Sequence, residues 1–376
     1  MEQRSKGSTA VPNLPLDVIM IILYRLPVKC LLRFRCVCKS WRNLISEPSF
    51  VEMHLRRSIE NNLNLIISKD FFHFYSIDYN VCEDEKRAVK LNETQLPNFM
   101  RVCSCNGLLC LSNRDNAFLW NPSTREVKQL PDCPVKFQSG IYYSWGIGYD
   151  PKANEYKVIR IANIYKSELH LFPHQTEVMI CTLGTDLWRS LENIPWFIDS
   201  RVSAMVVGGV PHWLATKRGS CIKQSIISFD VRVEEFREVQ WPMNNCNGQQ
   251  FCLLSRIYLG VIRGCLSILS RGFGECLEIY VMKEYGIRES WTKEFKFRLP
   301  IEYRDVLYSM SFGFLKNGEV LLLQSFRTKL LLYNPENDKV SDVSVRGYRD
   351  WAILGSYAES LVSLESKNGI EEPQQV

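Results

Sequence analysis

The chain has 376 residues, of which 46% are hydrophobic, enough to bury full cores in one small and one large domain. Its 14 cysteines at irregular spacings are typical of reduced thiols rather than of a secreted disulfide scaffold, so we expect a cytoplasmic or nuclear protein. The net charge of +5 lies at the N-terminus, because residues 1–60 contain 10 Lys/Arg and 5 Asp/Glu, and the other 316 residues contain 36 of each.

A helical module is predicted over residues 12–56, after a flexible N-terminus over residues 1–11. Ile19, Ile22, Leu23 and Leu26 follow the i, i+3, i+4, i+7 spacing of one apolar helix face. Two prolines bound this helix: Pro15 suits its first turn, and Pro27 must end it and begin a second element that carries Val28, Leu31 and Leu32. The apolar run at 18–24 is too short to span a bilayer, so no membrane role is expected.

The module continues with a third and a fourth short helix, whose apolar residues share a face: Val37, Trp41, Leu44 and Ile45, then Phe50, Val51, His54 and Leu55. So short a module cannot bury all of these large side chains, so part of the apolar surface is expected to meet a partner. The alternative is that it packs only against the following domain. The basic residues Lys29, Arg33, Arg35, Lys39 and Arg42 either steer an acidic partner, protein or nucleic acid, or form a solvated helix face.

The same segment resembles an F-box along its whole length. The matching run is Asn13-Leu14-Pro15, Ile22-Leu23-x-x-Leu26-Pro27-Val28, Leu31, Val37-Cys38-Lys39-x-Trp41-x-x-Leu44-Ile45 and Pro48-x-Phe50. The resemblance implies that the module binds a Skp-type adaptor, which links to a cullin. The positions that it implies for adaptor binding are Leu14, Pro15, Ile22, Leu26, Pro27, Leu31, Val37 and Trp41. Which of them face the adaptor and which hold the helices together stays open.

From about residue 62 the sequence changes to short apolar runs separated by Gly, Asn-Pro and Asp-Pro, which predicts many strands joined by turns. A unit of about fifty residues repeats about six times, with glycines before the strands at 107, 148, 208–209, 264 and 318. Such a repeat predicts an all-β, kelch-like β-propeller over residues 62–364, followed by a flexible tail over residues 365–376. The strands at 351–354 and 361–364 are expected to complete the first blade. A β-sandwich is the alternative.

This half is similar to the plant F-box-associated interaction domain. The similar segments are 106–108, 120–125, 146–150, 156–158, 212–214, 229–230 and 282–291, which include Trp120-Asn121-Pro122, Gly146-x-Gly148 and His212-Trp213-Leu214. The family includes pollen receptors that target self-incompatibility ribonucleases, and regulators that turn over plant immune receptors. The motifs mark the scaffold and do not identify the target.

Residues that would carry catalysis or bind a metal are sparse. Pro173 breaks the helix that the pair His170 and His174 would need as zinc ligands, so we interpret it as a loop pair. Cys36-x-Cys38 and Cys103-x-Cys105 lack a second ligand pair, and Gly146-x-Gly148 is an incomplete dinucleotide motif. All three are interpreted as structural, and so are Trp120, Trp188, Trp213 and Trp291, expected in the core. We therefore expect no catalytic residue, cofactor or metal.

The two resemblances together imply the substrate-recognition subunit of an SCF-type (Skp–cullin–F-box) E3 ubiquitin ligase, which is expected to hold a protein target for ubiquitination and proteasomal degradation. The target is expected at loops that mix aromatic and charged residues, at 83–90, 137–145, 164–176, 194–202 and 242–250. One alternative is a β-propeller lectin or carbohydrate-active enzyme with a helical extension. A nucleic-acid-binding protein is disfavoured, because the basic helices lack interleaved aromatics and the rest of the chain is neutral.

Overall fold

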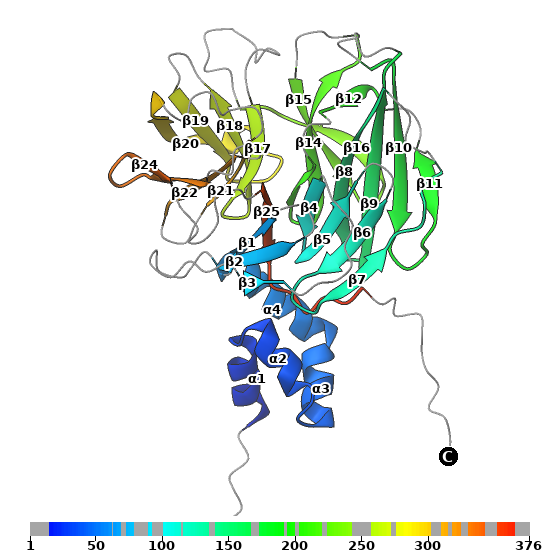
Figure 1. Ribbon diagram of the computed structural model, residues 1–376, viewed down its shortest axis with the longest axis vertical. Coiled ribbons are helices and arrows are strands. Elements are labelled where there is room, and N and C mark those ends of the chain that lie inside the picture. The colour runs from blue at the N-terminus through cyan, green and yellow to red at the C-terminus, as the bar shows by residue number, and fades with distance from the viewer. Residues whose placement is uncertain are drawn as a thin grey trace, which may run out of the picture.

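A computed structural model describes residues 15–61, 63–68, 73–78, 89–91, 101–113, 116–134, 140–166, 173–191, 194–199, 203–219, 224–242, 257–271, 276–301, 310–314, 318–324, 330–342 and 352–364. A helical module projects from one end of a large β domain (Figure 1). The expected termini at 1–11 and 365–376 lie outside the described residues. None of the helices in the described ranges is long and apolar enough to cross a membrane.

Four helices form the module: α1 (Leu16–Tyr24), α2 (Val28–Phe34), α3 (Lys39–Ser46) and α4 (Pro48–Asn61). Pro15 and Pro27 occupy the N-cap positions of α1 and α2, as the missing N–H and fixed φ of proline favour. The last helix continues five residues past the boundary expected at 56, because its final turns pack against β1 and β25 of the β domain.

The strands of the described ranges form six separate antiparallel sheets, which confirms the expected kelch-like propeller of about six blades and excludes a two-sheet sandwich. Sheet A contains β1 (Leu63–Ser68), β2 (Phe74–Asp78), β3 (Val89–Lys90) and β25 (Ala352–Ala358). Sheet B contains β4 (Arg101–Cys105), β5 (Leu108–Ser112), β6 (Ala117–Asn121) and β7 (Glu126–Gln129). Sheet C contains β8 (Ile141–Asp150), β9 (Glu155–Ile164), β10 (Gln175–Thr182) and β11 (Trp188–Leu191).

Sheet D has a fifth strand, because its inner edge is divided between two short strands that both pair with β14. It contains β12 (Trp196–Ile198), β13 (Met205–Val207), β14 (Val210–Lys217), β15 (Gln224–Asp230) and β16 (Glu235–Val239). Sheet E contains β17 (Ile257–Ile262), β18 (Cys265–Arg271), β19 (Cys276–Met282) and β20 (Trp291–Arg298), with a short helix η3 (Arg288–Ser290). Sheet F contains β21 (Met310–Phe314), β22 (Val320–Gln324), β23 (Leu330–Asn334) and β24 (Lys339–Asp342).

Sheet A joins the two ends of the propeller, because β25 pairs with β1 from Leu63↔Ala358 to Ser68↔Ala352. The expected completion of the first blade by the last strand is thereby confirmed for β25, whereas residues 361–364, also expected as a strand, form none. Apolar clusters fill the spaces between consecutive sheets from A to F. Trp120, Trp213 and Trp291 are buried in these clusters, as predicted, while Trp188 is half-buried and donates its Nε1–H to the Pro131 carbonyl at 2.7 Å.

Two glycines of β8 explain the incomplete dinucleotide motif as a packing feature. A Cβ at Gly146 would lie 2.4 Å from Trp213 Cζ2, and a Cβ at Gly148 would lie 2.3 Å from Val231 Cγ2. Trp213 lies on β14 and Val231 lies in the turn between β15 and β16, both within sheet D, so glycine lets sheets C and D approach closely.

The turns on the side of the helical module (the module-side end) are tight and share one design. An Asn or Asp at the first turn position accepts a backbone N–H two residues later, and a residue at the last position has positive φ. Such Asx turns explain why Asn-Pro and Asp-Pro mark the strand ends in the sequence. The positive-φ residues are Arg125, Asn154, Glu234 and Asp338 in the four Asx turns, and Asp186 in a turn that begins at Thr182 instead.

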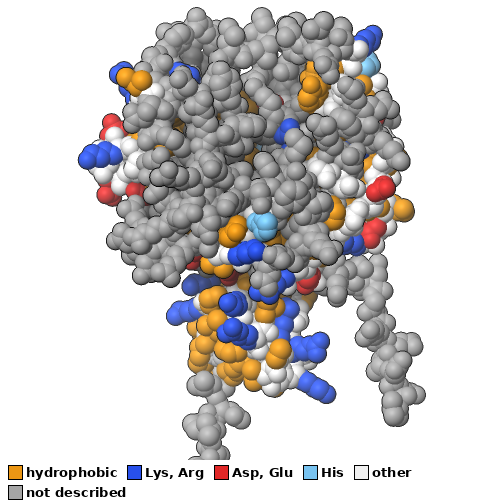
Figure 2. Space-filling model, viewed as in Figure 1, with side chains coloured by type: hydrophobic (Ala, Val, Ile, Leu, Met, Phe, Trp, Pro, Cys, Tyr) orange, Lys and Arg blue, Asp and Glu red, His pale blue; other side chains and the backbone are white. Residues whose placement is uncertain are grey.

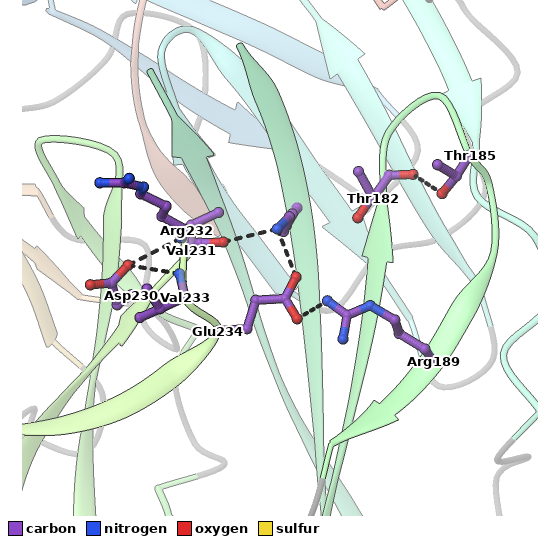
Figure 3. A network of polar contacts seen from close by, with 9 residues as sticks. Thr182, Thr185, Arg189, Asp230, Val231, Arg232, Val233 and Glu234 are labelled. Carbon is purple, nitrogen blue, oxygen red and sulfur yellow. Dashed lines mark hydrogen bonds and ion pairs between the residues drawn. The ribbon is translucent and has the colours of Figure 1, made fainter. Parts of the chain in front are cut away.

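One of these turns anchors a buried polar network between sheets C and D (Figure 3). Lys157 Nζ donates to Glu234 Oε1 at 2.6 Å and to the Val231 carbonyl at 3.0 Å. Arg189 forms an ion pair with the other carboxylate oxygen of Glu234. Because the buried Lys157 donates to two acceptors from sheet D, the network stabilises the contact between the two sheets.

Candidate functional site

The helical module exposes a group of large apolar side chains on its outer surface. On α1, Leu16 is 61% exposed, Ile21 54% and Ile22 47%, and Val18 is also exposed. Val37, in the turn between α2 and α3, is 62% exposed. We call these five residues the apolar face. Figure 2 shows hydrophobic side chains gathered on the lower part of the module, with Lys and Arg beside them.

The interior of the module is well packed, so the apolar face is not a sign of a loose fold. Leu23, Val28, Leu31, Ile45 and Phe50 are buried together, with exposures of 1% or less. His54, also buried, donates from Nε2 to the Leu26 carbonyl at 2.8 Å and ties α4 to the end of α1. Burial lowers the pKa of His54, so the neutral form is favoured.

The structure divides the eight residues that the sequence predicted for adaptor binding. Four are exposed: Pro15, Ile22, Pro27 and Val37. Leu26 and Trp41 are half-buried against the core of the module, and Leu31 is fully buried there, which assigns Leu31 to holding the helices together. Leu14 lies outside the described residues. Adaptor binding by these positions remains a prediction.

Sequence reasoning missed Leu16, Val18 and Ile21, which are among the exposed residues of the apolar face. It selected one stripe, Ile19, Ile22, Leu23 and Leu26, of which Ile22 is exposed and the other three pack in or against the core of the module. The available signal was that nearly every residue of α1 is apolar, because a helix that is apolar on all sides must cover a second surface. With one side packed on α2–α4, the other side is left for a partner.

The C-terminal segment 359–364, which we call the strap, joins the module to the propeller. Glu359 accepts the backbone N–H of Val28 at 3.2 Å and so caps α2, which has no side-chain cap of its own. Leu361 is buried in the core of the module. Asn121 of sheet B donates to the carbonyls of Ser360 at 3.0 Å and Val362 at 2.7 Å. These contacts hold the module against sheets A and B.

The propeller end opposite the module (the far end) is the second candidate region. The strands that flank the expected loops at 137–145, 164–176, 194–202 and 242–250 meet there, whereas those flanking 83–90 end on the module side. Part of each of these five loops lies outside the described residues: 83–88, 137–139, 167–172, 200–202 and 243–250. At the far end Tyr142 is half exposed and its ring meets Tyr165 edge-on, with 5.4 Å between centroids.

The described residues contain no group of three or more His, Cys, Asp or Glu side chains placed to hold a metal ion. His170 lies outside the described residues, and His174 bonds through Nδ1 to the Ile164 carbonyl at 2.8 Å. Cys103 and Cys105 are buried, and burial raises the pKa of Cys105 to about 12, so it stays a thiol. Cys36 and Cys38 are exposed in the module.

Comparison with known proteins matches both halves of the chain to described families. Residues 11–52 match the F-box domain, and residues 62–366 match the F-box associated beta propeller domain. Three relatives from Arabidopsis thaliana are similar over most of their length. F-box protein CPR1 is 29% identical over 89% of this chain and 85% of its own length. A second F-box protein is 30% identical over 90% and 89%, and an F-box/kelch-repeat protein is 28% identical over 96% and 99%.

Proposed function

Because this chain belongs to the F-box proteins that carry an F-box-associated β-propeller, we propose that it is the target receptor of an SCF-type ubiquitin ligase. In this proposal, the apolar face docks on a Skp-type adaptor, the adaptor joins a cullin, and the propeller holds a protein target for ubiquitination and degradation. The observation that carries it is the exposed apolar face on a module whose interior is already packed.

The energetics of the apolar face support a docking role. Fully burying a Leu, Ile or Val side chain contributes about 1.5–3 kcal/mol, and the apolar face exposes five such side chains, four on α1 and one in the turn after α2. Exposed apolar residues concentrated in this way mark interaction sites, whereas scattered ones carry no such information. The sum, at most about 15 kcal/mol for complete burial, is comparable with the about 4–15 kcal/mol that association costs, so a stable interface also needs further contacts with the partner.

The opposite positions of the two candidate surfaces fit a receptor. The apolar face lies on the module, and the strand ends that carry the expected target loops lie at the far end (Figure 1). Adaptor and target can therefore bind together. The strap keeps the two surfaces in a fixed relation, and the reaction then proceeds because the target lysine is held near the activated ubiquitin, a proximity effect that needs no catalytic residue in this chain.

Adaptor binding is tested with the full chain, a purified Skp-type adaptor and the double variant Ile21→Gln, Ile22→Gln. Gln is a good helix former, so α1 is retained while its outer face becomes polar. At about 2 kcal/mol per side chain, about 4 kcal/mol for the two, the affinity is expected to fall by about 700-fold. The matched control is Ile59→Gln on α4, which is 42% exposed and outside the apolar face. Equal affinities of both variants and the unchanged protein would refute the docking role.

Target binding is tested by exchanging residues 166–172 and 243–250 for the corresponding segments of a relative, followed by affinity capture and mass spectrometry. If the far-end loops select the target, the captured proteins change while the recovered adaptor does not. Capture of the same proteins after the exchange would argue against target selection by these loops. Loss of the ubiquitinated forms of a captured protein in the Ile21→Gln, Ile22→Gln variant then links the two surfaces.

A further inference from the structure

The positive charge of this protein is concentrated in one stretch of the helical module. Residues 18–46 contain six Lys/Arg and no Asp or Glu. Because the whole chain has a net charge of +5, the remaining residues carry 5 − 6 = −1. The stretch includes most of α1 and the whole of α2 and α3, so it is the same part of the module that carries the apolar face.

The structure distinguishes one internal basic residue from five outward ones. Arg35 is half-buried and donates from Nη2 to the Ile45 carbonyl at 3.5 Å. The other five are exposed, and none forms an ion pair with another described residue. These five, which we call the basic border, are Arg25, Lys29, Arg33, Lys39 and Arg42.

Basic residues elsewhere in the described part of the chain are commonly paired. Arg56 on α4 bonds Glu52 at 2.7 Å, Lys128 bonds Asp186 at 2.8 Å, and Lys293 bonds Glu278 at 2.9 Å. In the basic border, the spacing places like charges together instead: Lys29 and Arg33 are four residues apart on α2. A like-charge pair at i, i+4 destabilises a helix by about 0.2–0.5 kcal/mol, a cost that an acidic surface opposite the helix would remove.

We propose that the surface which receives the apolar face is an apolar groove of a protein bordered by Asp and Glu side chains. The basic border then accelerates docking by attracting that acidic rim before the apolar side chains engage. This inference rests on the proposed function, since it specifies the chemistry of the same docking site. A protein is favoured over a nucleic acid because the basic border adjoins five exposed aliphatic side chains, which match a groove and not a phosphate backbone.

The test measures association and dissociation rates of the full chain with a purified Skp-type adaptor at about 0.05 M and about 0.5 M salt, where screening differs several-fold. The variant is Lys29→Glu, Arg33→Glu, and the milder Lys29→Gln, Arg33→Gln guards against a folding defect. The matched control is Lys166→Glu, Lys217→Glu, which reverses two exposed charges on the propeller. Both charge-reversed proteins have the same net charge, 5 − 4 = +1.

At low salt the association rate of the module variant is expected to fall about 10-fold, with the Gln variant intermediate and the propeller control unchanged. At high salt the rates should converge, and dissociation rates should differ little. Equal association rates of both charge-reversed proteins would overturn the inference. If the unchanged protein bound no adaptor, the proposed function itself would fail. If the module variant lost salt-dependent binding to duplex or single-stranded RNA and not to the adaptor, the basic border would serve nucleic acid, which also overturns the inference.

Discussion

The substitution Gly107→Ala tests whether the strap fixes the module to the propeller. Gly107 lies in the tight turn between β4 and β5 with φ +81°. A Cβ there would lie 2.3 Å from Ser360 Cβ in the strap and 2.6 Å from the Ala358 carbonyl oxygen at the end of β25. Gly264 is a matched control, because it occupies the equivalent turn between β17 and β18 with φ +74° and would meet nothing within 4 Å.

The two substitutions share one cost and differ in another. An Ala held at positive φ costs about 1–2 kcal/mol at either position. At Gly107 the new methyl group must also displace the strap or the end of β25, and such overpacking costs a further ~1–3 kcal/mol. We therefore expect Gly264→Ala to lower the free energy of unfolding by about 1–2 kcal/mol and Gly107→Ala by about 2–5 kcal/mol.

Denaturant unfolding monitored by tryptophan fluorescence measures the total cost, and amide hydrogen exchange locates it. In Gly107→Ala the Val28 amide, which Glu359 accepts at 3.2 Å, should lose protection when the strap moves. In Gly264→Ala that amide should stay protected. Equal stability losses in the two variants, with the Val28 amide protected in both, would refute the view that the strap is held in this tight contact.

Three further predictions concern buried polar groups. Burial lowers the pKa of His212, whose Nε2 bonds the Tyr285 hydroxyl at 2.7 Å, from 6.5 to about 4. Folding favours the neutral form of His212. The free energy of unfolding therefore keeps its full value above pH 6.5 and decreases as the pH falls from 6.5 towards 4, by up to about 1.4 kcal/mol per pH unit. His212→Gln should abolish this slope in unfolding measured across that range, and the exposed control His174→Gln should retain it. Glu234→Gln leaves Lys157 buried without its carboxylate (Figure 3) and should lower the free energy of unfolding by about 3 kcal/mol in denaturant. The control Glu235→Gln, at an exposed position, should lower it by less than about 0.5 kcal/mol. Similar values for the two variants would contradict the role of the network. Asn121→Ala removes two hydrogen bonds to the strap besides its turn bonds and should lower the free energy of unfolding by about 3 kcal/mol. Asn334→Ala, in the equivalent turn of sheet F, should lower it by about 1–2 kcal/mol. If thermal unfolding ranked the two variants the other way, the stabilising role of the strap contacts would be refuted.

Sequence patterns that extend over one helix or one blade were sufficient to predict the fold. The spacing of Ile19, Ile22, Leu23 and Leu26 gave one helix face, and the fixed φ of Pro15 and Pro27 gave the starts of α1 and α2. The fifty-residue repeat predicted six sheets because each unit contains its own hairpins, and antiparallel neighbours close in sequence pair locally. These features depend on residues within one helix or one blade, so the order of residues along the chain determined them.

The tertiary structure decided which of these surfaces is covered. Leu31 and Ile22 look alike in the sequence, yet Leu31 is buried among the helices and Ile22 is exposed, because the neighbours that cover Leu31 come from α3, α4 and the strap. Val28 and Glu359 are 331 residues apart and meet only after the propeller ring is closed by β25. Periodicity shows that a residue lies on a face, but burial depends on distant segments that the closed ring brings together. The sequence alone therefore predicted the helices, the blades and the family, and the fold separated the apolar face from the core.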